Sequence, residues 1–302
     1  MKKQPLKYRL NVIGGALIIF LLIRTYVPMI GLQAGLNKNF DLWLIFYMLT
    51  LALSCLLPIM FIERMCDFHP QVIKQPEFKM EHGRLVMTCM MMFIGFSVIG
   101  SIALMPLEKL GISFPASQLL PIDSTLTLVL YFVFTSVIPA IFEELLVRGE
   151  ILNLLLPYGR KFAVIASALI FMMMHTQVQS FIPVFGAGVL LACVYLYTDN
   201  IFVSMSLHFV NNAYSFVMMY MQQKVNAISA ASFAAFAIAV IIALGIISAF
   251  YLKRRKTDFL RPLSEGRGQY SLKQLTKSPV LVVALLCCFM AIMEQMFRDL
   301  SL

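Results

Sequence analysis

Long runs of apolar residues, separated by short polar segments, follow one another along most of the chain. A membrane helix needs about 17 to 25 such residues to cross roughly 30 Å of hydrocarbon. Helices also satisfy their own backbone hydrogen bonds, which lipid cannot do. The pattern therefore predicts an all-α, polytopic integral membrane helical bundle with about nine transmembrane helices. The nine runs cover residues 10–32, 42–62, 85–107, 125–156, 162–178, 182–198, 201–221, 229–252 and 279–297.

Composition and charge support the membrane assignment and predict an orientation. Hydrophobic residues make up 60% of the chain and charged residues only 13%, whereas about a quarter of the residues of an average soluble protein are charged. Cytoplasmic loops carry an excess of Lys and Arg, and a cytoplasmic N-terminus places Arg64, Arg84, Arg160, Lys161 and the basic segment 253–277 on that side. The net charge of +9 is then a topology signal plus attraction to anionic lipid. The lipid bilayer is the expected partner and nucleic acid is not. The compactness of the chain favours a bacterial plasma membrane protein.

Two adjacent carboxylates lie inside the apolar stretch between Leu126 and Leu156. An ionised side chain at the centre of a membrane helix costs about 2.5 to 3.5 kcal/mol on insertion scales, so Glu143 and Glu144 need partners or a use. Arg148 follows Glu144 by four residues, with the acid first, which is the favourable order for an ion pair on one helix face. Glu143, about 100° around the helix, is then the freer carboxylate. We expect an intramembrane functional site here.

Polar residues of later runs are expected to reach the same depth. Residues 157–161 form a helix-ending turn with Pro and Gly as breakers. If the flanking helices are antiparallel, Glu143 and His175 lie at equal distances from position 159, roughly 20 Å from the turn, and can face each other. His208 and Asn212 are four residues apart, so both can point from one helix face at a single substrate group.

These residues form three patterns that resemble the motifs of a known family. In this order and within apolar helices, they are similar to the motifs of the CPBP (Abi) intramembrane proteases. That family includes the type II CAAX prenyl endopeptidases and bacterial bacteriocin-processing or self-immunity proteins. The resemblance covers residues 125–220. The patterns are Glu143-Glu144-x-x-x-Arg148, Phe171-x-x-x-His175 and His208-x-x-x-Asn212.

The resemblance implies a role for each candidate residue. Glu143 and His175 would activate a water molecule, while His208 and Asn212 would stabilise the oxyanion. Glu144, with its basic partner four residues later, would hold the site together. The same chemistry is reasonable on general grounds, because peptide hydrolysis needs a base for water and donors aimed at the developing negative charge.

The resemblance also divides the chain into three parts. We expect N-terminal transmembrane helices over residues 1–124 and a catalytic CPBP-like core over residues 125–221. Residues 222–302 are expected to form C-terminal transmembrane helices with a basic cytoplasmic loop.

A metal-dependent mechanism is a second hypothesis. One carboxylate and two histidines also match a catalytic zinc ligand set with an open water position. We favour a glutamic peptidase without a cofactor, because HExxH does not occur in the sequence and Asn212 suits an oxyanion donor better than a zinc ligand. The sequence leaves a zinc metallopeptidase as the alternative.

We therefore predict an intramembrane endopeptidase that hydrolyses a peptide bond of a membrane-associated or lipidated peptide. A proton-coupled transporter would also bury acids, Arg and His, although no paired broken helices or similar halves are visible. A non-catalytic membrane scaffold or immunity protein of the same fold is the third class. Arg24, inside the first run, is interpreted as an interfacial or interhelical polar residue.

Overall fold

The fold is helical throughout the part of the chain that the structure describes. The computed structural model describes residues 4–72, 77–109, 122, 124–175, 177–264 and 270–300. The helices are α1 (Leu6–Gln33), α2 (Phe40–Cys66), α3 (Met80–Lys109), α4 (Thr125–Phe132), α5 (Ile138–Glu144), α6 (Asn153–Leu155), α7 (Arg160–Met173), α8 (Phe181–Thr198), α9 (Ile201–Lys224), α10 (Ala227–Arg254), α11 (Arg261–Ser264) and α12 (Pro279–Leu300).

Six helical segments of the described chain are long and apolar enough to cross a bilayer, which indicates a multi-pass membrane protein. The expected number of nine crossings is not confirmed. The run at 162–178 folds as α7, whose 14 residues reach only about 21 Å at 1.5 Å per residue. The last run forms a shorter apolar helix, Pro279–Glu294. The six segments are Leu6–Gln33, Phe40–Cys66, Met80–Pro106, Thr125–Tyr158, Val178–Thr198 and Ala227–Arg254.

The helix that carries the two adjacent acids, residues 125–158, is continuous but contains two wide turns. The first is a π-helical stretch at Val133–Val137, directly before α5. Pro139 lies in the first turn of α5 and cannot donate a backbone hydrogen bond to the carbonyl four residues earlier, which is a physical reason for the wide turn. The second π-helical stretch is Leu145–Leu152. Wide turns of this kind occur frequently at functional sites.

Asn153 donates hydrogen bonds to carbonyl groups of the second wide turn. Its Nδ2 donates to the carbonyl oxygens of Arg148 and Gly149, both at 2.9 Å. The same nitrogen lies 2.8 Å from the hydroxyl of Tyr195 on α8. The irregular backbone is therefore fixed against α8.

The predicted turn after this helix is confirmed. The helix ends at Tyr158 and α7 begins at Arg160, with Gly159 between them at a φ of 121°. From there α7 packs against α8. Small residues allow a close approach, since a Cβ on Gly188 would lie 3.0 Å from the Cα of Ala168.

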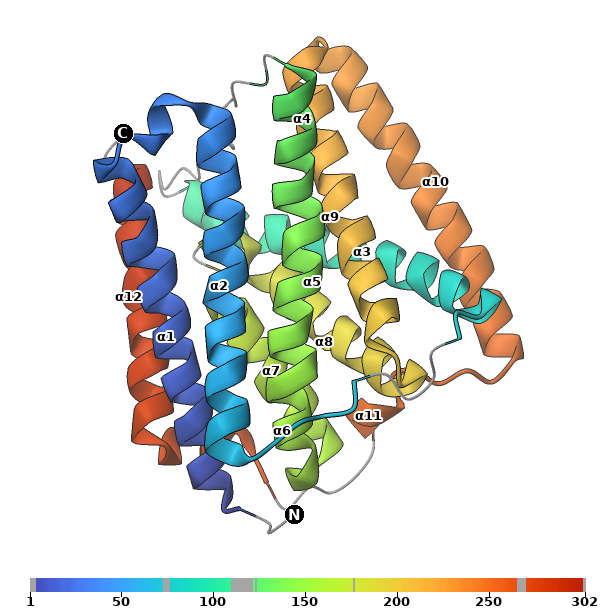
Figure 1. Cartoon of the computed structure of the whole chain (residues 1–302). Helices are drawn as coiled ribbons and strands as arrows, with labels where there is room; N and C mark the ends of the chain where they lie inside the picture. Colours follow the sequence, from blue (N-terminus) through green and yellow to red (C-terminus); the bar gives the residue numbers. More distant parts are fainter. Residues whose placement is uncertain are drawn as a thin grey trace.

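Helices from distant parts of the sequence enclose α5. Figure 1 shows α1, α2 and the α4–α6 helix running side by side, with α12 against α1 and α3 steeply inclined to them. The helix α5 contacts α2 on one side and α9 on another, while the π-helical stretch below it contacts α7. The two acids therefore lie where four helices meet.

Candidate active site

Glu144 and Arg148 form the buried ion pair that their spacing predicts. Arg148 Nη1 donates to Glu144 Oε1 at 2.7 Å, and neither side chain is exposed (0%). Arg148 Nη2 donates to the carbonyl oxygen of Gly188 at 3.1 Å. The guanidinium also lies over the ring of Phe171, 4.5 Å from its centre. Arg148 thus joins the helix of the acids to both α7 and α8.

His208 connects the two adjacent carboxylates. Its Nδ1 lies 3.0 Å from Glu144 Oε1, and its Nε2 lies 4.0 Å from Glu143 Oε2. Glu144 pairs with Arg148 as a carboxylate, and a carboxylate only accepts, so His208 Nδ1 is the donor of this hydrogen bond. The carboxylate fixes the ring orientation and leaves Nε2 directed towards Glu143, as in the imidazole–carboxylate pair of a catalytic triad.

His175 is held by the end of α7. Its Nδ1 lies 2.9 Å from the carbonyl oxygen of Phe171, and since a carbonyl only accepts, Nδ1 carries the hydrogen. In the neutral ring, Nε2 then keeps a lone pair. The ring of Phe171 lies edge-on to both imidazoles, with centroids 4.8 Å from His175 and 5.9 Å from His208. Phe171 therefore packs against both histidines and against Arg148.

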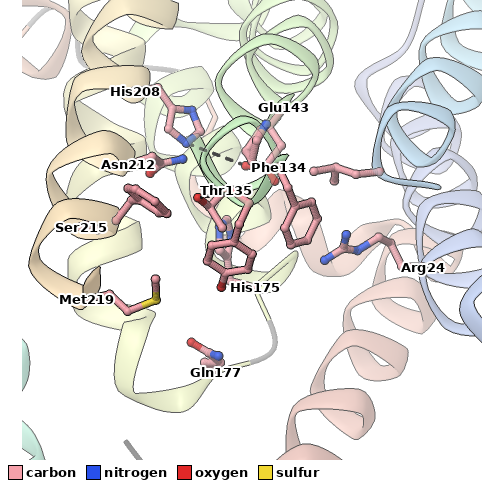
Figure 2. A pocket seen from close by; sticks show the side chains of 14 residues that line it. Arg24, Phe134, Thr135, Glu143, His175, Gln177, His208, Asn212, Ser215 and Met219 are labelled. Atoms are coloured by element: carbon pink, nitrogen blue, oxygen red, sulfur yellow. Dashed lines mark hydrogen bonds and ion pairs between the residues drawn. The ribbon is translucent and has the colours of Figure 1, made fainter. Parts of the chain in front are cut away.

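Glu143, His175, His208 and Asn212 line one cavity of about 500 Å³ (Figure 2). A second cavity of about 270 Å³ shares Glu143 and His175 with the first. Glu143 Oε2 is buried and has no hydrogen-bond partner. The Glu143 side chain thus lines both cavities, whereas Glu144 lines neither.

Asn212 lies one helical turn after His208 on α9. The Nδ2 of Asn211 donates to Asn212 Oδ1 at 3.4 Å, which leaves the Asn212 amide hydrogens for a cavity ligand. The remaining wall of the larger cavity is mainly apolar and aromatic, with contributions from Leu51, Tyr131, Phe134, Pro139, Phe216 and Met219.

Part of the lining was not predicted from the sequence. Arg24 of α1 lines both cavities, whereas its interpretation as an interfacial or interhelical residue did not connect it with the site. A charged residue inside the first apolar run was the available signal. Gln177 lines both cavities, and Thr135 and Ser215 line the larger one. Isolated uncharged polar residues of this kind carry no pattern that would single them out.

The described part of the chain contains no set of side chains that matches the zinc hypothesis. No three His, Cys, Asp or Glu side chains there are placed to hold one metal ion. Glu143, His175 and His208 line the same cavity, but their arrangement does not fit a zinc site.

Comparison with known proteins identifies the region around the cavity. Residues 125–214 match the family model of the type II CAAX prenyl endopeptidase Rce1-like proteins. No curated protein and no solved structure matches the chain. The chain therefore contains an Rce1-like domain of the type II CAAX prenyl endopeptidase (CPBP/Abi) family, as the three motifs predicted. All six candidate residues lie within it, and Arg24 lies outside it.

Proposed function

We propose that the chain is an intramembrane endopeptidase of the glutamic type, hydrolysing a peptide bond of a membrane-associated or lipidated peptide. The Rce1-like domain supports a peptidase. The observation that carries the proposal is the cavity lined by Glu143, His175, His208 and Asn212, in which the carboxylate of Glu143 has one oxygen without a hydrogen-bond partner.

In the proposed mechanism, Glu143 acts as the base. Its carboxylate removes a proton from a water molecule in the cavity, while His175 Nε2 accepts a hydrogen bond from the same water. The water oxygen attacks the carbonyl carbon and forms a tetrahedral intermediate. The proton then passes from Glu143 to the leaving amine as the C–N bond breaks. Glu143 returns to its ionised form, and water is the only reactant besides the peptide.

His208 and Asn212 act as the donors to the oxyanion. Because His208 Nδ1 already donates to Glu144, donation from Nε2 as well requires the imidazolium form. A single oxyanion donor is worth about 100- to 1000-fold in kcat.

We further propose a cytoplasmic N-terminus in a bacterial plasma membrane. In Figure 1, α1 begins, α2 ends and α6 meets α7 at the same end of the bundle. The basic residues Arg64, Arg160 and Lys161 belong to these segments, which is the distribution expected for a cytoplasmic face. The nine helical runs then lead from a cytoplasmic N-terminus to an external C-terminus. Because α7 is short, His175 would lie within the bilayer depth, where non-helical backbone is tolerated beside a cavity.

The test is peptide cleavage by the purified chain in liposomes, with a library of lipidated peptides. Glu143→Gln should reduce kcat/KM by about 100- to 10,000-fold, the range of general base catalysis. Glu150→Gln is the matched control, because Glu150 lies on the same helix, is 4% exposed and lines neither cavity.

Four outcomes would contradict the proposal. Full cleavage by Glu143→Gln would remove the base. Loss of cleavage with a chelator, restored by zinc, would reassign the mechanism to a metallopeptidase. Absence of cleavage together with proton-driven solute uptake would indicate a transporter, and absence of both would favour a scaffold or immunity protein.

A further inference from the structure

Arg24 is a cation of the cavity wall that the proposed hydrolysis does not use. It lies on α1, outside the matched domain, and its side chain is exposed. Among the described residues it has neither a hydrogen bond nor an ion pair. A guanidinium inside an apolar run is costly unless it faces water or a partner. Arg24 lines both cavities, so it faces a space that a ligand can enter.

Helix register places Arg24 close to the level of Glu143. Arg9 Nη1 of α1 donates to the carbonyl oxygen of Leu154 at 2.7 Å, which pins the two antiparallel helices at one point. Arg24 lies 15 residues beyond Arg9 and Glu143 lies 11 residues before Leu154. At 1.5 Å per residue these offsets are about 22 and 16 Å. The backbone positions of the two residues therefore differ in height by about one helical turn or somewhat more, since the π-helical stretch Leu145–Leu152 rises less per residue, and the two side chains line the same cavities.

The cavity has a polar side and a cationic side. Figure 2 shows His208 and Asn212 projecting from α9 on one side of Glu143 and Arg24 projecting on the other. A peptide whose carbonyl is held at His208 and Asn212 can extend past Glu143 towards Arg24. Arg binds a carboxylate with two parallel hydrogen bonds, a geometry that Lys lacks.

We propose that Arg24 is a specificity-determining residue that binds a carboxylate of the substrate peptide. The carboxylate is either the C-terminal group or an Asp or Glu side chain on one side of the scissile bond. The assignment of a peptide as the ligand rests on the proposed function. The carboxylate preference itself is a binding property and can be measured without turnover.

The probes are N-dodecanoyl heptapeptides of one apolar sequence in liposomes. One peptide ends in a free carboxylate, the second ends in a carboxamide, and the third ends in a carboxamide but carries one internal Glu. Binding is measured by fluorescence anisotropy on the wild type and on Arg24→Gln and Arg24→Lys. Arg64→Gln is the control, since it removes one exposed positive charge outside both cavities.

The wild type should bind at least one acidic peptide about 10- to 100-fold more tightly than the neutral peptide, the range of a charge-assisted hydrogen bond. Arg24→Gln should abolish this preference and leave binding of the neutral peptide unchanged, Arg24→Lys should keep part of it, and Arg64→Gln should keep all of it. Whichever acidic peptide is preferred identifies the source of the carboxylate. For a cleaved peptide, Arg24→Gln should raise KM more than it lowers kcat.

Equal binding of acidic and neutral peptides by the wild type would overturn the assignment of Arg24. A uniform loss of binding to all three peptides in Arg24→Gln would also overturn it, because it would indicate a structural role. Neither result depends on cleavage. If the wild type shows the preference but cleaves nothing, the proposed hydrolysis fails while the Arg24 assignment stands.

Discussion

Glu143 and Glu150 lie on one helix, in one apolar run, and differ in what surrounds them. Both have a buried Oε2 without a hydrogen-bond partner. Glu143 adjoins a cavity of about 500 Å³ and lies 4.0 Å from His208 Nε2. Glu150 is 4% exposed and lines neither cavity described above. A buried acid in a membrane helix therefore indicates a reaction site only where a proton partner and space for a ligand adjoin it.

The two buried arginines near these acids also differ in the groups that surround them. Arg148 pairs with a carboxylate at 2.7 Å. Arg9 instead donates to the carbonyl oxygen of Leu154 at 2.7 Å and lies 5.5 Å from the centre of the Tyr158 ring. The first cluster is an ion pair beneath a cavity, and the second is a packing contact between α1 and the end of the α4–α6 helix.

The largest expected effect on stability comes from breaking the ion pair. Arg148→Met leaves Glu144 buried without its partner, which should lower the free energy of unfolding by about 3 to 5 kcal/mol. Thermal denaturation in detergent, followed by circular dichroism, measures the loss. The double variant Glu144→Gln with Arg148→Met should recover most of it, because no charge is then left unpaired. If Arg148→Met alone were as stable as the wild type, the ion pair would not be what stabilises this region.

An intermediate effect is expected where α8 approaches α7. Gly188→Ala places a Cβ 3.0 Å from the Cα of Ala168, and backbone must move to relieve the contact. Overpacking of this kind costs about 1 to 3 kcal/mol, and it also displaces the Gly188 carbonyl that Arg148 binds. Both stability and peptide cleavage should fall.

Gly95→Ala is the matched control for that substitution. A Cβ on Gly95 meets nothing within 4 Å, so the change should be neutral or stabilise the helix by up to about 1 kcal/mol. Equal behaviour of the two variants would mean that the close approach of α7 and α8 does not matter to the site.

The smallest expected effect is that of Arg9→Met. It removes one hydrogen bond to a buried carbonyl, which should cost about 1 kcal/mol of stability. Cleavage should keep its wild-type kcat, because Arg9 lines neither cavity. A strong loss of kcat without loss of stability would contradict the separation of the two clusters.

Local features of the site could be predicted from the sequence. The apolar runs predicted the helices, and Pro157 and Gly159 predicted the turn before α7. The four-residue spacing predicted the ion pair between Glu144 and Arg148. Each depends on residues that are neighbours along the chain. The number of membrane crossings could not be predicted in this way. The apolar run at 162–178 is long enough to suggest a crossing, but its helix α7 has only 14 residues.

Features that depend on packing between distant helices could not be predicted. Arg24 reaches the cavity only because α1 lies beside the α4–α6 helix, and no local pattern specifies that neighbour. Glu150 shows the opposite problem, because it lies in the same apolar run as Glu143 but lines neither of the two cavities described above. The function of a charged residue here depends on which helix covers it.

The wide turn at Val133–Val137 has a consequence for how this helix could change. A π-helical turn holds one residue more than an α-helical turn, and each residue of an α-helix advances about 100°. Deleting one residue from this stretch would therefore let the helix become regular while its upper and lower halves keep nearly their present orientation. Tyr131 and Glu143, which lie on either side of the wide turn, would still project into the same cavity. A one-codon deletion in a regular part of the same helix would instead turn one half against the other by about 100° and separate these two side chains.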